Sequence, residues 1–444
     1  MRAAGGEAGE DRSGRFSSVL FVIVFCYFWI GISPFPSAND PDLLKAYGNT
    51  SNLINQLIVV AMSFVVLVAF LQHPARYLVL RAYVPLLVIF LWLLVTAGFS
   101  DSPATALRRI VYAGLVCMCS SAVLLLPRNS THFARMMGWC MLFAVCLSLA
   151  GVVLLPQRAI HQASDALEQM LAGDWRGHFG HKNVAAAAMV YAVFFGLYVA
   201  RSGFFKLGAL LSVCAAVFLL NSGGKTSAAM LPAVLVAAWF FERIGPLRIV
   251  VVAGGLIVMN TILMSAAVSP SIQALLTSMG IDPTFTDRAS IWELALSAVA
   301  SRPFTGYGLQ SFWQTDALVN GGKAASTWAV TAANAHNGYL DQLINGGVPL
   351  LVLMVIWLVF LPCHHASVAL RRGHDMALTR LFIRVWLFSL FFSCLENPFF
   401  SNNGPIWFTM LLSVFGLRLQ AYANLVKTPE ARPAPVARGR LVAA

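Results

Sequence analysis

The sequence predicts an all-α polytopic membrane protein. Apolar residues make up 59% of its 444 residues and charged residues only 11%. At the usual frequency of about 25%, a soluble chain of this length would carry roughly 110 charged residues. This chain has 30 Lys and Arg and 18 Asp and Glu. The composition excludes a soluble enzyme and a disordered chain, and the net charge of +12 does not indicate nucleic-acid binding.

Twelve apolar runs are candidates for membrane-spanning helices. The polar, basic segment 1–15 precedes the first run without a cleavage site, so we expect an uncleaved first helix. We expect helices 1–9 within 16–268, a large loop at 269–336, helices 10–12 within 337–422 and a disordered tail at 423–444. The runs are 16–32, 53–71, 78–98, 105–126, 134–155, 184–200, 204–221, 226–241, 248–268, 338–361, 381–396 and 405–422.

The distribution of Lys and Arg predicts the orientation of these helices. Basic residues near helix ends are retained in the cytoplasm. If the N-terminus is inside, every inner segment carries at least two Lys or Arg, so we expect both termini in the cytoplasm. The loop at 269–336, with its surface helices, is then periplasmic. The remaining basic residues gather mainly in 156–183, in 269–336 and at Lys225, which indicates an anionic ligand such as phosphate or pyrophosphate on the outer face. The alternative is that long loops translocate regardless of charge.

A surface helix is predicted to begin near Arg288. Thr286 or Asp287 can cap it, and Ile291, Trp292, Ala295, Leu296 and Val299 share one apolar face. The helix stops at Arg302-Pro303, before the Gly-rich turn 304–308. Arg288 would then lie near headgroup depth, where a guanidinium can bind phosphate oxygens at two points. The alternative is an arginine that only extends its charge to the membrane interface.

His336 and Asn337 stand where the tenth span begins. A neutral histidine there can take a proton from a sugar hydroxyl, with Asn337 or a nearby carboxylate fixing its tautomer. The alternatives are a structural interfacial histidine and a metal ligand without partners. Asp341, five residues on, is poorly spaced for a pair with His336 on one helix face.

Two further segments on the outer side could contact an anion. At Asn221–Ser227, Gly-Gly-Lys-Thr opens a predicted helix, which places backbone amides beside the Lys225 ammonium, although the full nucleotide-binding spacing is absent. In Arg176–Asn183, His178, His181 and Lys182 could contact the ligand, or the glycines could simply fold the loop back. The two histidines have no acidic third ligand nearby, and the eight cysteines lie in apolar runs, so we expect neither a metal nor a cofactor.

At these residues the chain resembles the O-antigen ligase and Wzy-type polysaccharide polymerase superfamily of bacterial inner membranes. The matching segments are Gly177–Asn183, Ser222–Thr226, Asp287–Trp292 leading to Pro303–Gly308, and His336–Tyr339 leading to Gly346-Gly347. The resemblance implies a membrane glycosyltransferase that uses a polyprenyl-diphosphate-linked glycan donor. His336 would be the base, and Arg288 and Lys225 would hold the pyrophosphate, with Arg176, His181 and Lys182 nearby. Supporting positions are Asn183, Trp292, Asn337 and Asp341.

Lys225 replaces the arginine that is common in the ligases, and this departure favours the exopolysaccharide polymerase branch of the superfamily. The reaction implied is the inverting, metal-independent joining of repeat units at the periplasmic face. The alternatives are an O-antigen ligase that transfers the glycan to lipid A core and a protein O-oligosaccharyltransferase. A transporter of the same lipid-linked glycan is less favoured, because the predicted spans carry few charges at their centres. Partners would be the donor, a glycan or lipid A-core acceptor, the bilayer and envelope-polysaccharide assembly proteins, with no nucleic acid.

Overall fold

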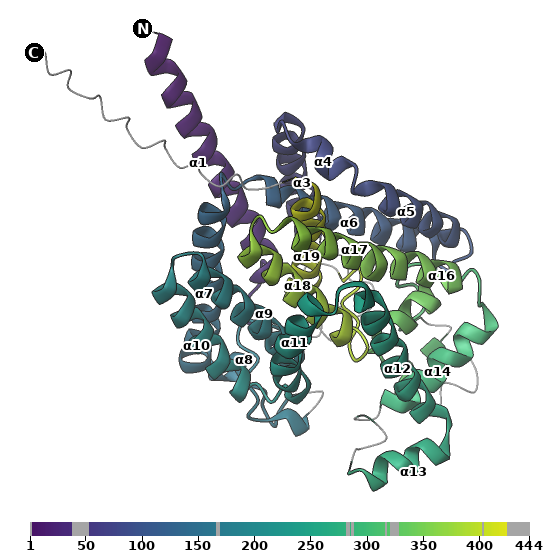
Figure 1. The fold of residues 1–444 in the computed structure, drawn as a ribbon. Coiled ribbons are helices and arrows are strands. Elements are labelled where there is room, and N and C mark those ends of the chain that lie inside the picture. The colour runs from purple at the N-terminus through teal and green to yellow at the C-terminus, as the bar shows by residue number, and fades with distance from the viewer. Residues whose placement is uncertain are drawn as a thin grey trace, which may run out of the picture.

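The computed structural model describes residues 2–37, 53–165, 169–280, 285, 288–315, 318–319, 328–401 and 404–423, with side chains from residue 14 onward. Helices dominate these residues, as the sequence predicts, and the described part contains no β-strand (Figure 1). The longer helices are α1 (Arg2–Trp29), α3 (Leu53–Gln72), α5 (Tyr83–Ala97), α6 (Pro103–Ala122), α7 (Ser130–Leu154), α9 (Lys182–Arg201), α10 (Phe205–Asn221), α11 (Lys225–Arg243), α12 (Arg248–Val268), α14 (Arg288–Ser301), α16 (Gly338–Val355), α17 (Leu361–Arg372), α18 (Met376–Phe392) and α19 (Pro405–Tyr422).

Every one of the twelve apolar runs contains a helix. By length and composition, six helical segments of the described chain can cross a membrane: Leu53–Gln72, Pro103–Leu125, Ser130–Leu154, Lys182–Arg201, Gly245–Val268 and Gly338–Arg372. Shorter apolar helices lie at Gly14–Trp29, Tyr83–Ala97 and Phe205–Asn221. The described part of the chain is therefore all-helical with several membrane-spanning candidates, and the full count of twelve spans stays a prediction.

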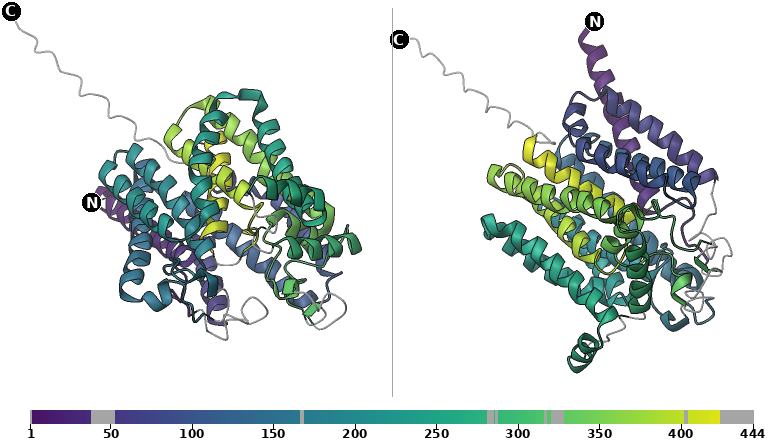
Figure 2. Two further views of the ribbon diagram at one scale, coloured as in Figure 1. Left: turned by 90° about the horizontal axis from the view of Figure 1, so that it is seen from below. Right: turned by 90° about the vertical axis from the view of Figure 1, so that its right-hand side faces the viewer.

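Burial separates the helices at the centre of the bundle from those at its rim. In its most apolar window, α9 has 78% of its residues buried, whereas α3 has 28% and α12 has 22%. Helices α18 and α19 are also buried along nearly their whole length, and they lie between the other helices in Figures 1 and 2. The core therefore surrounds α9, α18 and α19, while α3 and α12 present apolar faces outward, as helices that meet lipid do.

The longest helical segment is interrupted at two glycines. Within α16, Gly346 and Gly347 leave the helical conformation, and Gly347 has a φ of +67°. Backbone groups freed by this break bond to the Gly-rich turn: Tyr307 N–H donates to the Ile344 carbonyl (2.8 Å), and Val348 N–H donates to the Pro303 carbonyl (2.8 Å). The turn 303–308, which follows α14, is thereby attached to the middle of α16.

The segment predicted as a large loop is partly helical. It contains α13 (Pro270–Ser278), α14 and the short η5 (Trp328–Thr331), and α14 packs against α12 and α16. Ile291, Trp292 and Ala295 are buried on α14, and Leu296 and Val299 are partly buried, so the predicted apolar face is confirmed. The capping residues proposed for this helix, Thr286 and Asp287, lie outside the described residues, and the side of the membrane on which the segment lies stays a prediction.

Candidate functional site

A carboxylate joins the ends of several helices at one end of the bundle. Glu396 follows α18, in the connection to α19. The side chains that meet it come from the beginning of α9, from the beginning of α14 and from the residue before the cap of α16. All of these segments are adjacent in space although they are far apart in the chain.

Three side chains bond to the Glu396 carboxylate. Arg288 Nη2 donates to Oε1 at 2.6 Å, and its Nη1 donates to the Leu395 carbonyl at 2.6 Å. Asn183 Nδ2 also donates to Oε1, at 2.8 Å. His336 Nδ1 lies 3.1 Å from Oε2. Arg288, Asn183 and His336 are thus held around one acidic group, which the sequence analysis did not identify.

The electrostatic surroundings keep Glu396 ionised. Burial alone would raise the pKa of this carboxyl, but the opposing effects of Arg288, of the hydrogen bond and charge of His336, and of His181 lower it to about 2. The side chains of Glu396 and Arg288 are each 17% exposed, so the ion pair is largely shielded from water. At neutral pH the cluster therefore contains a fixed negative charge beside the imidazole.

His336 itself is held in an unusual backbone conformation, with a φ of +46°. Its N–H donates to Asn334 Oδ1 at 2.8 Å, and the carbonyl of the preceding Ala335 accepts a bond from Trp292 Nε1 at 2.8 Å. Positive φ is uncommon for a residue other than glycine and persists where surrounding contacts impose it. Trp292 thereby helps to hold the backbone just before His336.

Asp341 fixes the same segment from the other side. It accepts bonds from Trp313 Nε1 at 2.7 Å and from the Ala335 N–H at 3.0 Å, and it is 2% exposed. These contacts orient the backbone before His336 without contacting the imidazole. A direct pair between Asp341 and His336, for which the spacing in the sequence is poor, is not among these contacts.

Asn337 is the N-cap of α16. Its Oδ1 accepts bonds from the Tyr339 and Leu340 N–H groups at 3.0 and 2.9 Å. Its Nδ2 donates to Asn260 Oδ1 and to the Cys394 carbonyl. The sequence suggests that either Asn337 or a nearby carboxylate fixes the tautomer of His336. The Asn337 side chain is used in the helix cap, whereas the carboxylate of Glu396 contacts the imidazole.

The segment before α9 brings further charge to this end. Lys182 Nζ lies 2.6 Å from Asp174 Oδ2, and its side chain is 15% exposed. His181 caps α9 by accepting the Asn183 N–H, and its ring centroid lies 5.4 Å from that of His161. Asn183 lies in the first turn of α9, directly after the cap residue His181. Its hydrogen bond to Glu396 connects this segment to the cluster.

Arg176 and His178 lie in a buried stretch, residues 176–179. Arg176 is 1% exposed, and its Nε donates to the Arg158 carbonyl at 3.0 Å. His178 lies between the Ser148 hydroxyl (2.7 Å) and the Trp29 carbonyl (2.9 Å). Of the two possibilities for this segment, these contacts favour folding of the loop at His178. Because Arg176 is buried, its charge can act on a ligand only at a distance, without direct contact at the surface of the site.

Lys225 begins α11 after the Gly223-Gly224 turn, as the sequence predicts. Its side chain is exposed, and it makes no ion pair with any described residue. A Cβ atom at Gly224 would meet the Cβ of Ala186 at 2.3 Å, so the turn packs directly on α9. Ala186 is one helical turn from Asn183, which places the Lys225 turn at the same end of the bundle as Glu396.

One signal in the sequence could have identified Glu396. It is the sole acidic residue between Met376 and Tyr422, and it stands at the very end of an apolar run. A charge in that position is costly unless it is paired or faces water. The described residues contain no group of three or more His, Cys, Asp or Glu that could hold a metal ion.

Comparison with known proteins adds one finding. Residues 207–355 match the model of a protein family described as O-antigen ligase. The matched segment contains Lys225, Arg288 and His336, and it ends before Glu396. No curated protein matches the chain.

Proposed function

From the premise that this chain carries an O-antigen ligase domain at residues 207–355, within the O-antigen ligase and Wzy-type superfamily, we propose that it joins repeat units of a polyprenyl-diphosphate-linked oligosaccharide. The family is one of membrane enzymes that ligate or polymerise glycans. The single observation that carries the finer proposal is the cluster of His336, Arg288 and Asn183 around Glu396.

The proposed base is His336. With Nδ1–H donating to the Glu396 carboxylate, Nε2 keeps its lone pair and makes no hydrogen bond to the described residues. The side chain is 33% exposed, so an acceptor hydroxyl can reach it. A negative partner also stabilises the imidazolium that forms when the proton is taken. Glu396 acts here as a positioning residue, because it works through the histidine.

The proposed anion-binding residues are Arg288 and Lys225. Arg288 uses two of the five N–H donors of a guanidinium in the contacts above, which leaves three for phosphate oxygens. Lys225 adds a point charge at the beginning of α11, which packs on α9 and α18. Lys182 and His181 lie at the same end, with Lys182 paired to Asp174, while Arg176 contributes from the buried layer.

The proposed reaction is a single displacement with inversion. The acceptor oxygen forms a bond to the anomeric carbon, and its proton passes to His336 Nε2. The bond between the anomeric carbon and the phosphate oxygen breaks, and polyprenyl diphosphate leaves with that electron pair. Arg288 and Lys225 would stabilise the charge that develops on the leaving group.

Lys225 supports the exopolysaccharide polymerase branch over ligation to lipid A core or to protein, because the ligases commonly carry arginine there. We further propose the bacterial inner membrane as the location, with both termini in the cytoplasm and the cluster on the periplasmic side. This orientation rests on the distribution of Lys and Arg near the helix ends.

The proposal can be tested with purified protein in proteoliposomes that carry lipid-linked repeat units on the outer face. His336→Ala should lower the rate of polymer formation by about 100- to 10,000-fold, the usual effect of removing a general base. His364→Ala is a matched control, because His364 is exposed on α17, away from the cluster. Polymer formation by His336→Ala at the rate of the control would contradict the assignment of the base. If wild-type protein moves donors between leaflets and leaves them unjoined, the chain is a transporter instead.

A further inference from the structure

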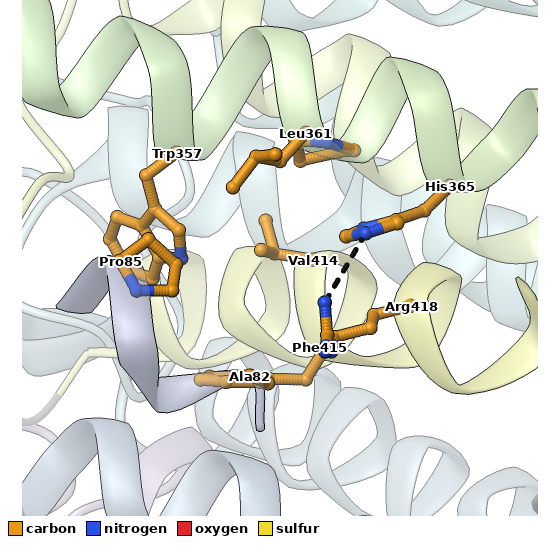
Figure 3. A pocket seen from close by; sticks show the side chains of 9 residues that line it. Ala82, Pro85, Trp357, Leu361, His365, Val414, Phe415 and Arg418 are labelled. Carbon is orange, nitrogen blue, oxygen red and sulfur yellow. Dashed lines mark hydrogen bonds between the residues drawn. The ribbon is translucent and has the colours of Figure 1, made fainter. Parts of the chain in front are cut away.

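Polar side chains also meet outside the proposed catalytic cluster. His365 of α17 and Arg418 of α19 point toward one another (Figure 3), but the pocket that they line has a volume of about 20 Å³, which is room for no more than a water molecule. Asp174 pairs with Lys182 at the beginning of α9. This second pair adjoins the turn that carries Lys225, so it can affect the proposed donor site.

The Asp174 carboxylate covers the turn that leads into α11. A Cβ atom added at Gly223 would lie 2.2, 2.3 and 2.5 Å from Oδ1, Cγ and Oδ2 of Asp174, so the carboxylate rests directly on the backbone of this glycine. The next residue, Trp175, donates its N–H to the Asn221 carbonyl at 3.0 Å. These contacts hold the turn from which Lys225 starts α11.

Lys182 holds the Asp174 carboxylate in this position. Its Nζ lies 2.6 Å from Asp174 Oδ2, and the two side chains are 15% and 29% exposed, so the pair is partly shielded from water. Lys182 is the first residue of α9, and a positive charge is unfavourable beside a helix N-terminus. The carboxylate of Asp174 offsets this charge. The Lys182 ammonium is therefore already engaged by a side chain of the protein.

A buried histidine fixes the backbone of both partners. His161 is 4% exposed, its N–H donates to the Asp174 carbonyl at 2.9 Å, and its Nε2 accepts from the Lys182 N–H at 3.3 Å. Its Nδ1 lies 3.3 Å from Oδ2 of the buried Asp165. Burial lowers the pKa of His161, which keeps the accepting nitrogen unprotonated at neutral pH. The Asp174–Lys182 pair is therefore built into a rigid part of the segment before α9.

We propose that Asp174 and Lys182 are positioning residues for Lys225. The Lys225 side chain is exposed and pairs with no described carboxylate, so the place of its ammonium depends on the turn from which it extends. The Asp174–Lys182 pair joins that turn to the beginning of α9, where Asn183 bonds to Glu396. It thereby sets the position of Lys225 relative to the cluster. This inference rests on the proposed function, because it takes Lys225 as a contact of the donor diphosphate.

The test measures kcat/KM for the lipid-linked donor with the full chain in proteoliposomes. Asp174→Ala and Lys182→Met should each lower it by about tenfold, which corresponds to the loss of one interaction with a charged group. The double variant should also lose about tenfold rather than a hundredfold, because the two residues act as one pair. In a Lys225→Gln background, Asp174→Ala should change kcat/KM by less than about twofold, because the lysine that it positions is gone.

Asp101→Ala is the matched control, because Asp101 also pairs with a cation, Arg302, but at a more exposed position. It should leave kcat/KM unchanged. Melting temperatures identify variants that misfold. Since Asp174 precedes α9 and Lys182 belongs to it, misfolding of one variant leaves the other as a test.

Three outcomes would contradict the inference. An effect of Asp174→Ala that is equally large with and without Lys225→Gln would overturn it and leave the role of Lys225 intact. A rise in kcat/KM for Asp174→Ala would mean that Lys182 binds the donor directly once it is released. An unchanged kcat/KM in Lys225→Gln itself would remove both the donor contact of Lys225 and this inference, whereas His336→Ala tests the proposed reaction separately.

Discussion

The imidazole of His336 and the carboxylate of Glu396 are 60 residues apart in the chain and 3.1 Å apart in the structure. The same carboxylate binds Arg288 at 2.6 Å, so one acidic group contacts both the proposed base and a proposed anion-binding residue. This arrangement links two parts of the proposed site. It fixes the tautomer that can accept a proton, and it holds the guanidinium beside the histidine.

Glu396→Gln should lower kcat by at least about 100-fold while the protein remains folded. The neutral amide can present either an oxygen or an NH2 group to Nδ1, so the correct tautomer is no longer imposed. Loss of the negative charge also disfavours the imidazolium. The rate of polymer formation should be measured together with the melting temperature, which should stay close to that of the wild type.

Glu396→Asp is the control for this variant, since it retains the charge and shortens the side chain by one methylene. It should lose less activity than the amide. A loss of activity in Glu396→Gln that is matched by an equal loss in Glu396→Asp and by a fall in melting temperature would show that the residue only supports the fold.

Arg288→Lys should weaken donor use more than it affects turnover. Lysine keeps the charge but cannot bind the Leu395 carbonyl, the Glu396 carboxylate and a phosphate in one planar geometry. We expect the KM for the lipid-linked donor to rise by about tenfold or more. Arg302→Lys is a suitable control, because Arg302 pairs with Asp101 at a more exposed position. Equal KM values for the two variants would contradict a role of Arg288 in binding the donor.

The sequence was sufficient to predict a helix in each of the twelve apolar runs, but it did not predict α17, which continues beyond the run 338–361. It was less reliable at their ends. The run 78–98 is divided into α4 (Arg76–Leu80) and α5, and the run 381–396 is helical only to Phe392. That second difference matters, because the chain turns after Phe392 and thereby presents Glu396 to the site. Helix ends depend on tertiary contacts such as the bond from the Gly338 N–H to the Ser393 carbonyl, which no local pattern contains.

The candidate site was predicted in part for a similar reason. Three site residues can be recognised from their local sequence. His336 precedes the start of a helix, Arg288 lies in the first turn of a helix, and Lys225 follows a Gly-rich turn. The role of Glu396 depends on bringing α9, α14 and α18 together, and a lone carboxylate after an apolar run does not show its partners. Conversely, His178 stands out in the sequence, although its contacts with Ser148 and Trp29 are those of a buried structural group.

Gly347→Ala should destabilise the protein. A Cβ atom there would lie 2.3 Å from the Phe304 carbonyl oxygen, and the φ of +67° is unfavourable for alanine. Backbone strain of this kind is worth about 1–3 kcal/mol, and displacement of the 303–308 turn adds to it. The measurement is the melting temperature in detergent. Gly254→Ala is the control, because its added Cβ would meet no atom within 4 Å; comparable melting temperatures for the two variants would be inconsistent with the tight contact.

Stability should also depend on pH through His178. Burial lowers the pKa of this histidine from 6.5 to about 4, although its bond to the Trp29 carbonyl opposes the shift. The unfolded chain therefore binds a proton at His178 more readily than the folded chain between about pH 6.5 and pH 4. The contribution of the neutral, buried His178 to the free energy of unfolding is present above this range and is lost as the pH falls through it. The shift corresponds to at most about 3 kcal/mol. His178→Gln disturbs the contacts with Ser148 and Trp29, so it should melt below the wild type at pH 7. Because the variant cannot titrate at this position, only the wild type loses this contribution on acidification, and the difference between their melting temperatures should shrink as the pH approaches 4. A difference that stays constant over this range would mean that His178 is equally protonated in both states.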